Sequence, residues 1–147
     1  MIEHVWSVFC QNSVIDGSTN TISLFNAIEQ IRLNKTLEGK SKAIDMPNVI
    51  FSLFSRSNDC SPCAGKVKYE LVNPDNKIMK GVEYPVDLSD VQYQRIRVRS
   101  ERFPIASPGV YRFIVSLLQE GSKSWRKVAS IPILLSYEPE DALKNIG

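Results

Sequence analysis

The sequence predicts an all-β protein, a two-sheet antiparallel β-sandwich of about eight strands with a short C-terminal helix. Three observations favour this fold class. Apolar and polar residues alternate over many short runs, turn residues separate the runs, and the runs are rich in β-branched and aromatic side chains. A single sandwich domain over residues 1–147 is the expected architecture.

The clearest hairpin lies in residues 103–137. The turn sequence Ala-Ser-Pro-Gly at 106–109 precedes a strand whose inward face holds Tyr111, Phe113, Val115 and Leu117. Residues 120–124 are polar and contain Gly121, which predicts a hairpin loop before the return strand at 129–136. Pro132 cannot donate a ladder hydrogen bond, so this return strand is expected at a sheet edge or at a bulge.

The N-terminal part is harder to assign. Residues 4–10 predict a first strand, and residues 11–20 a polar connection in which Val14 and Ile15 could form a short strand. Residues 21–33 fit either a helix, by the spacing of Leu24, Ile28 and Ile31, or a strand buried on both faces. We favour the strand because the neighbouring segments are strands. Polar residues 34–46, closed by Pro47, predict a crossing between sheets.

The middle of the chain continues the strand pattern. Residues 48–56 place Val49, Phe51 and Leu53 on one face, although Ile50 and Phe54 make the other face partly apolar as well. After a loop at 57–65, further strands are expected at 66–71, 82–88 and 94–99. Residues 139–147 carry a helix signal, with proline first and acidic residues in the first turn.

Several of these motifs together resemble a known group of domains. Trp6, Tyr69 and Phe113 with their neighbours look like the small Ig-like or C2-like sandwiches. The narrower resemblance, to a group of small uncharacterised bacterial β-sandwich domains, is carried by strand-and-turn motifs: Ile15-Asp16, Ile22 to Asn26, Pro47, Phe103-Pro104 and Pro108 to Phe113. It spans most of the chain and implies the sandwich fold and a bacterial or phage origin. It implies no activity for any residue.

Composition narrows the functional classes. Charged residues make up 23% of the 147 residues and the formal net charge is +2, which favours neither disorder nor a strong affinity for polyanions. The first ten residues lack the features of a signal peptide, and the chain has no apolar run long enough for a membrane-spanning helix. Three cysteines fit a reducing compartment. We therefore expect a cytoplasmic protein that does not enter a membrane.

Cys60-Ser-Pro-Cys63 is the motif with a chemical interpretation. Paired thiols at this spacing occur in redox proteins, but no helix follows Cys63 to lower a thiolate pKa. A zinc site would also need Cys10 and His4, which lie roughly 20 Å apart along one strand. We therefore expect structural loop cysteines, with no metal and no cofactor, and retain Cys60 and Cys63 as weak candidates for a metal or redox site.

An arginine stripe is the remaining candidate site. Arg95, Arg97 and Arg99 alternate along one predicted strand, and Arg112 could lie beside them on a neighbouring strand. Such a face can bind anions or nucleic acid. Exposed strand positions are polar in any case, and nearby glutamates can neutralise the patch, so nucleic acid is a disfavoured partner.

No other pattern in the sequence supports catalysis. His4 is the sole histidine and has no G-x-S-x-G motif near it, the aspartates are scattered over separate turns, and no phosphate-binding glycine loop is present. By elimination, the sequence favours a non-enzymatic domain that binds a protein partner or itself. The alternatives are a redox or hydrolytic enzyme using Cys60 and Cys63, and an anion or nucleic-acid binder using Arg95, Arg97 and Arg99.

Overall fold

The computed structural model describes residues 1–57 and 61–139. These residues form β-strands, one short 3-10 helix (η1, Lys35–Leu37) and no α-helix. The strands are β1 (Ile2–Ile15), β2 (Ile22–Ala27), β3 (Gln30–Asn34), β4 (Ala43–Arg56), β5 (Ala64–Val72), β6 (Ile78–Asp87), β7 (Tyr93–Pro104), β8 (Gly109–Gln119) and β9 (Arg126–Glu138). The expected all-β class is confirmed.

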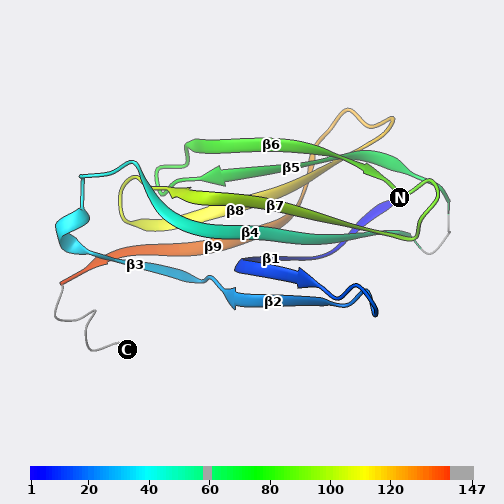
Figure 1. Cartoon of the computed structure of the whole chain (residues 1–147). Coiled ribbons are helices and arrows are strands. Elements are labelled where there is room, and N and C mark those ends of the chain that lie inside the picture. The colour runs from blue at the N-terminus through cyan, green and yellow to red at the C-terminus, as the bar shows by residue number, and fades with distance from the viewer. Residues whose placement is uncertain (58–60, 140–147) are drawn as a thin grey trace.

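The strands form two layers (Figure 1). Sheet A has the order β2-β1-β4-β7, and sheet B has the order β3-β9-β8-β5-β6. The described residues form nine strands where about eight were expected, because residues 21–33 form two strands, β2 and β3, in different sheets. The preference for strand over helix in this segment is confirmed.

The core lies between the two sheets, as alternation along each strand requires. Its centre is an aromatic cluster in which the ring of Phe113 lies 4.9 Å from that of Phe9 and 6.3 Å from that of Phe103, measured between centroids. Tyr111, Phe113, Val115 and Leu117 all face this core, as predicted. The register of the 103–137 hairpin is therefore the one that its sequence indicates.

The chain changes sheets twice near its N-terminal end. β2 pairs with β1 in sheet A, and β3 then pairs with β9 in sheet B as a parallel neighbour, so the sandwich is not wholly antiparallel. The polar segment at 34–46 returns the chain to sheet A, which confirms the predicted crossing, although β4 already begins at Ala43. Figure 1 shows β2 and β3 following one another along the rim of both layers.

The β1–β2 hairpin folds back over the outer face of sheet A. In the β1–β4–β7 register, Arg97 lies level with Val8, so a straight β1 would carry Ser13 about 16 Å beyond it. Arg97 nevertheless bonds Ser13, and Arg95 bonds Asn20. The chain must therefore reverse direction just after Cys10, as the ribbon of β1 in Figure 1 does. We call residues 12–25 the flap.

The flap closes a second, smaller core. Ile22 and Leu24 on the flap pack with Trp6 and Val8 against buried Cys10, Val49 and Phe51. The rings of Trp6 and Phe51 stack with their centroids 5.7 Å apart. This second core explains the apolar residues on both faces of residues 48–56, because β4 is covered by sheet B on one side and by the flap on the other.

Pro132 lies in a stretch of β9 that is open on one side. β9 is an inner strand of sheet B, but β3 pairs only with Leu134–Glu138. Among the described strands, β8 is therefore the one ladder neighbour at Pro132, which is locally an edge position. Pro132 therefore leaves no ladder bond unmade on its open side.

The expected C-terminal helix at 139–147 lies, from residue 140 on, outside the described residues.

Tyr111 ties the start of β8 to the preceding turn. Its hydroxyl accepts a hydrogen bond from the Ala106 N–H at 2.6 Å and donates one to the Ser107 carbonyl at 2.8 Å. Gly109 follows at φ 138°, a conformation that L side chains rarely adopt, and a Cβ there would lie 3.0 Å from Pro74. The Pro-Gly turn is thus fixed from inside by Tyr111 and from outside by Pro74.

We predict that Phe113→Ala lowers the free energy of unfolding by about 3–5 kcal/mol, because it removes a central aromatic ring and leaves a cavity. Arg112→Ala, one residue away on the exposed face, should change it by less than about 0.5 kcal/mol. Urea denaturation of both variants measures the difference. Equal midpoints would contradict the register described here.

Candidate functional site

The arginine stripe lies on the outer face of sheet A. Arg95, Arg97 and Arg99 alternate along β7, opposite Leu53, Phe51 and Val49 of β4. Arg112 does not join them: it lies on β8, in the other sheet, opposite Pro132. The expectation that Arg112 lies beside the stripe is wrong, because β7 and β8, although consecutive in the chain, belong to different layers.

Two of the three stripe arginines bind the flap. The Arg95 guanidinium donates to the Asn20 carbonyl at 2.6 Å and to the Asn20 side-chain oxygen at 2.9 Å. Arg97 donates to the Ser13 hydroxyl at 3.4 Å, and Arg99 forms an ion pair with Glu101 at 3.2 Å. The stripe is therefore mainly a clamp that holds the flap over the second core, and less an open anion site.

The two described cysteines, Cys10 and Cys63, belong to different cores. Cys10 is fully buried beneath the flap, where burial raises the pKa of its thiol. Cys63 is partly buried against the main core, and its carbonyl accepts a bond from the Leu88 N–H. Cys60 lies outside the described residues, so the Cys60/Cys63 hypothesis stays untested. Within the described ranges, no three His, Cys, Asp or Glu side chains are grouped to hold a metal ion.

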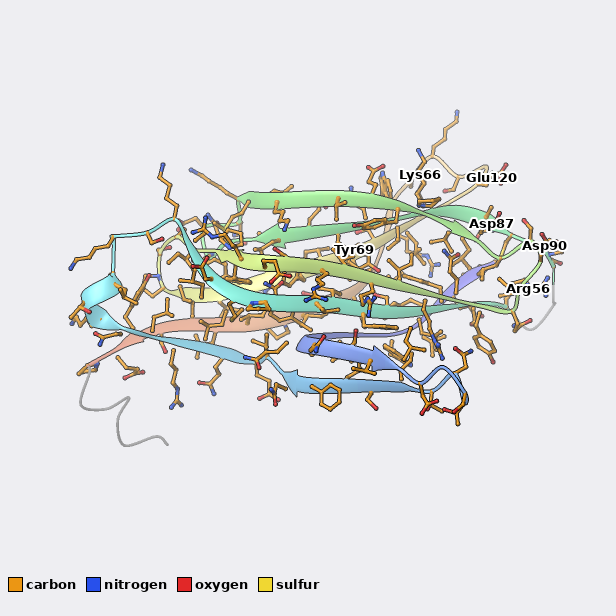
Figure 2. All side chains as sticks on the ribbon, viewed as in Figure 1. Arg56, Lys66, Tyr69, Asp87, Asp90 and Glu120 are labelled. Atoms are coloured by element: carbon orange, nitrogen blue, oxygen red, sulfur yellow. The ribbon has the colours of Figure 1, made fainter. Side chains whose placement is uncertain are left out.

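Charged residues gather at the end of the sandwich that holds the β4–β5 and β6–β7 loops. Figure 2 shows Arg56, Asp87 and Asp90 at this end, far from η1. Asp87 accepts a bond from the Ser89 N–H, and hydrogen bonds from Ser89 lower the pKa of its carboxyl group. This is the chemistry of a turn-forming aspartate, as the sequence indicated, and not that of a catalytic acid.

A polar chain that sequence reasoning missed crosses the main core. His4 Nε2 lies 2.7 Å from the Ser7 hydroxyl, which lies 2.6 Å from that of Ser52. Tyr69, labelled in Figure 2, donates to Ser52 from sheet B at 2.9 Å. Burial raises the pKa of Tyr69 to about 12, so its hydroxyl stays protonated and available as a donor. This chain of hydrogen bonds supplies partners for polar side chains that the sandwich buries.

The His4–Ser7 pair has the spacing of a nucleophile and its base, but lacks the rest of a catalytic site. Among the described residues, no carboxylate orients the other ring nitrogen, and the hollow described next is lined by neither His4 nor Ser7. The imidazole instead packs edge-on against Phe54 at 5.7 Å between centroids. The pair is a structural contact.

An apolar groove lies where the chain changes sheets. Its volume is about 670 Å³, within the range of ligand-binding clefts. Segments from the β2–β3 junction, η1, the start of β4 and the β7–β8 connection form it, and its apolar lining includes Ile28, Ile31, Leu33, Ile44, Met46 and Ile105. The sequence signal was present but weak: Leu37, Ile44 and Met46 are apolar residues within a segment assigned as a polar loop.

One wall of the groove is an unpaired strand edge. In a parallel ladder, alternate residues direct both backbone groups to the same neighbour. The Glu29 carbonyl accepts a hydrogen bond from the Leu134 N–H, and Gln30 pairs with Leu134 in the ladder. The backbone N–H and C=O groups of Ile31 and Leu33 therefore face β9. The backbone N–H and C=O groups of Gln30 and Arg32 therefore point away from the sheet. β3 pairs with β9 alone among the described strands.

No family model matches the sequence, and no curated protein matches it either. In the described part of the chain, no helix has the length and apolar character needed to cross a membrane. The features that bear on function are therefore the groove and its strand edge.

We predict that Arg95→Ala loosens the flap, because it removes both bonds to Asn20. The free energy of unfolding should fall by about 1 kcal/mol, and Cys10 should react faster with a thiol reagent in peptide-resolved mass spectrometry. Arg112→Ala, which also removes an exposed arginine but touches no flap residue, is the control. Unchanged Cys10 labelling in Arg95→Ala would show that the clamp does not hold the flap.

We predict that stability declines on mild acidification because of His4. Burial lowers the pKa of folded His4 below 6.5, so the unfolded chain binds a proton first as the pH falls through 6.5. The free energy of unfolding should therefore decrease from about pH 7 to pH 5. His4→Asn should lack this decrease, as thermal melts across that range would reveal. Equal slopes for both proteins would contradict the assignment.

Proposed function

We propose that this chain is a non-enzymatic, Ig-like protein-interaction domain. It binds an extended segment of a protein partner, which adds as a strand to the open edge of β3 and places alternate apolar side chains in the groove. The observation that carries the proposal is the juxtaposition of the two features: outward-facing backbone groups of Gln30 and Arg32, and an apolar hollow of about 670 Å³ beside them.

Strand pairing and one side-chain contact support the Ig-like assignment. The pairs β4–β7, β5–β8 and β8–β9 match the pairs B–E, C–F and F–G of an Ig sandwich, and β6 beside β5 takes the place of C′. Tyr111, near the start of the F-equivalent strand, bonds back to Ala106 and Ser107 as a tyrosine corner does. Ig-like sandwiches act through edges and loops, which agrees with a binding role.

We prefer this function to the two alternatives on specific grounds. Arg95 and Arg97 donate to flap residues, which leaves fewer free N–H donors for an anion or nucleic acid on that face. An enzyme at Cys60 and Cys63 that used a metal would need further ligands, and the described ranges hold no group of three His, Cys, Asp or Glu side chains for one. Neither Cys63 nor the stripe arginines Arg95, Arg97 and Arg99 line the groove.

The test is a strand-edge block. A library of displayed random peptides is selected on the wild-type protein, and the selected peptide is titrated by calorimetry against Gln30→Pro and Gln30→Ala. Proline removes an N–H that faces away from β9, so the fold tolerates it, but an added strand cannot pair there. We expect Gln30→Pro to weaken binding at least tenfold and Gln30→Ala less than threefold.

Two outcomes would overturn the proposal: no peptide enriched above background, or a peptide that binds Gln30→Pro as well as it binds the wild type. A dimer that forms with rising concentration and is lost in Gln30→Pro would support it in another form, with a second copy supplying the strand. Sedimentation of both proteins without peptide measures that case.

A further inference from the structure

The groove has a basic rim, made of Arg32, Lys35, Lys40 and Lys42. All four are exposed, and the segment between β3 and β4 that carries the lysines also carries Leu37 and Ser41 of the groove lining. The rim therefore lies at the mouth of the groove, at the end of β3 that holds Asn34. Figure 1 shows this segment, with η1, at the tip of the sandwich away from the chain's N-terminal end.

The rim is not neutralised from within the described part of the chain. None of its four cations forms an ion pair there, and Asp45, which lies in the groove wall, is already paired with Arg102 at 3.0 Å. Among the described residues, the other nearby carboxylates are Glu29, Glu38 and Glu138, which lies opposite Asn34 on β9, so the four cations exceed them by one.

We propose, on the basis of the binding function above, that the added strand is acidic: an extended protein segment whose apolar core is flanked by Asp or Glu where it passes η1. The apolar groove and open edge supply affinity that is independent of charge. The rim adds selection among extended segments, since complementary charge sets specificity and association rate more than overall affinity. A basic or neutral flank would leave the rim cations unpaired.

The experiment uses three peptides that share the apolar core of the selected peptide and differ only in three flanking residues: glutamate, glutamine or lysine. Binding is measured by fluorescence anisotropy at about 50 mM and about 500 mM salt. Three exposed ion pairs at a factor of about two to three each predict roughly tenfold tighter binding of the glutamate peptide than of the glutamine peptide at low salt. The ratio should fall towards one at high salt.

Matched variants assign the effect to the rim. The triple variant Lys35→Gln, Lys40→Gln, Lys42→Gln should bind the glutamate and glutamine peptides equally, and its affinity for the glutamine peptide should equal that of the wild type. A control with the same charge loss, Lys66→Gln, Lys123→Gln, Lys127→Gln, changes lysines of sheet B and its β8–β9 loop. It should keep the full tenfold preference.

The outcomes separate this inference from the function beneath it. Equal binding of all three peptides, or a preference retained in the rim variant, would overturn the acidic partner and leave strand addition standing. Failure of every peptide to bind would overturn both. Dodecanoate provides a further arm: if it displaces the glutamine peptide from the groove at micromolar concentration, the occupant is an amphipathic anion and not a strand, and the proposal is wrong.

Discussion

The need to bury both faces of β4 shapes the N-terminal half of this protein. Ile50 and Phe54 face sheet B, while Val49 and Phe51 face the opposite way, and an uncovered row of apolar side chains on a sheet surface would be costly. The flap supplies the missing cover. The flap and its flanking residues occupy the chain between Cys10 and Ala27. The segment that follows therefore begins at the edge of the sandwich, where β3 can pair with sheet B.

This route also creates the candidate site. β3 joins β9 over five residues only and leaves its other edge open. The chain must then return to sheet A to begin β4. The polar connection that makes this return lines the groove and leaves its interior open. The groove is thus the space left by a chain that changes sheets twice within a short stretch. Its apolar lining is continuous with the main core through Ile31 and Ile105.

Local pattern predicted most of the strands but few of their partners. Alternation placed Tyr111 and Phe113 inward because a half-buried strand forces a period of two. It could not show that the run at 21–33 divides between sheets. Ile22 and Ile31 are both apolar residues of that run, and the sequence does not indicate that they face different cores. Arg112 was misplaced for the same reason: consecutive strands usually neighbour each other, but here the chain crosses to the other layer.

The candidate site was harder to predict because its features depend on tertiary contacts. The arginine stripe is real as a pattern, yet two of its members bind flap residues far away in sequence. Ser7 and Ser52 read as ordinary exposed strand positions, and only the register of β1 with β4 brings them together. The groove residues Leu37, Ile44 and Met46 were visible, but nothing local distinguishes an apolar residue in a loop from one that lines a cavity.

The parallel pairing of β3 with β9 also orders the events of synthesis. β3 leaves the ribosome early, but its ladder partner follows only after β4 to β8 have been made. Until β9 arrives, the segment has no neighbour to fix its direction, and contacts so distant in sequence form slowly. The proposed binding edge is therefore completed last, after the flap and strands β4 to β8 have been made.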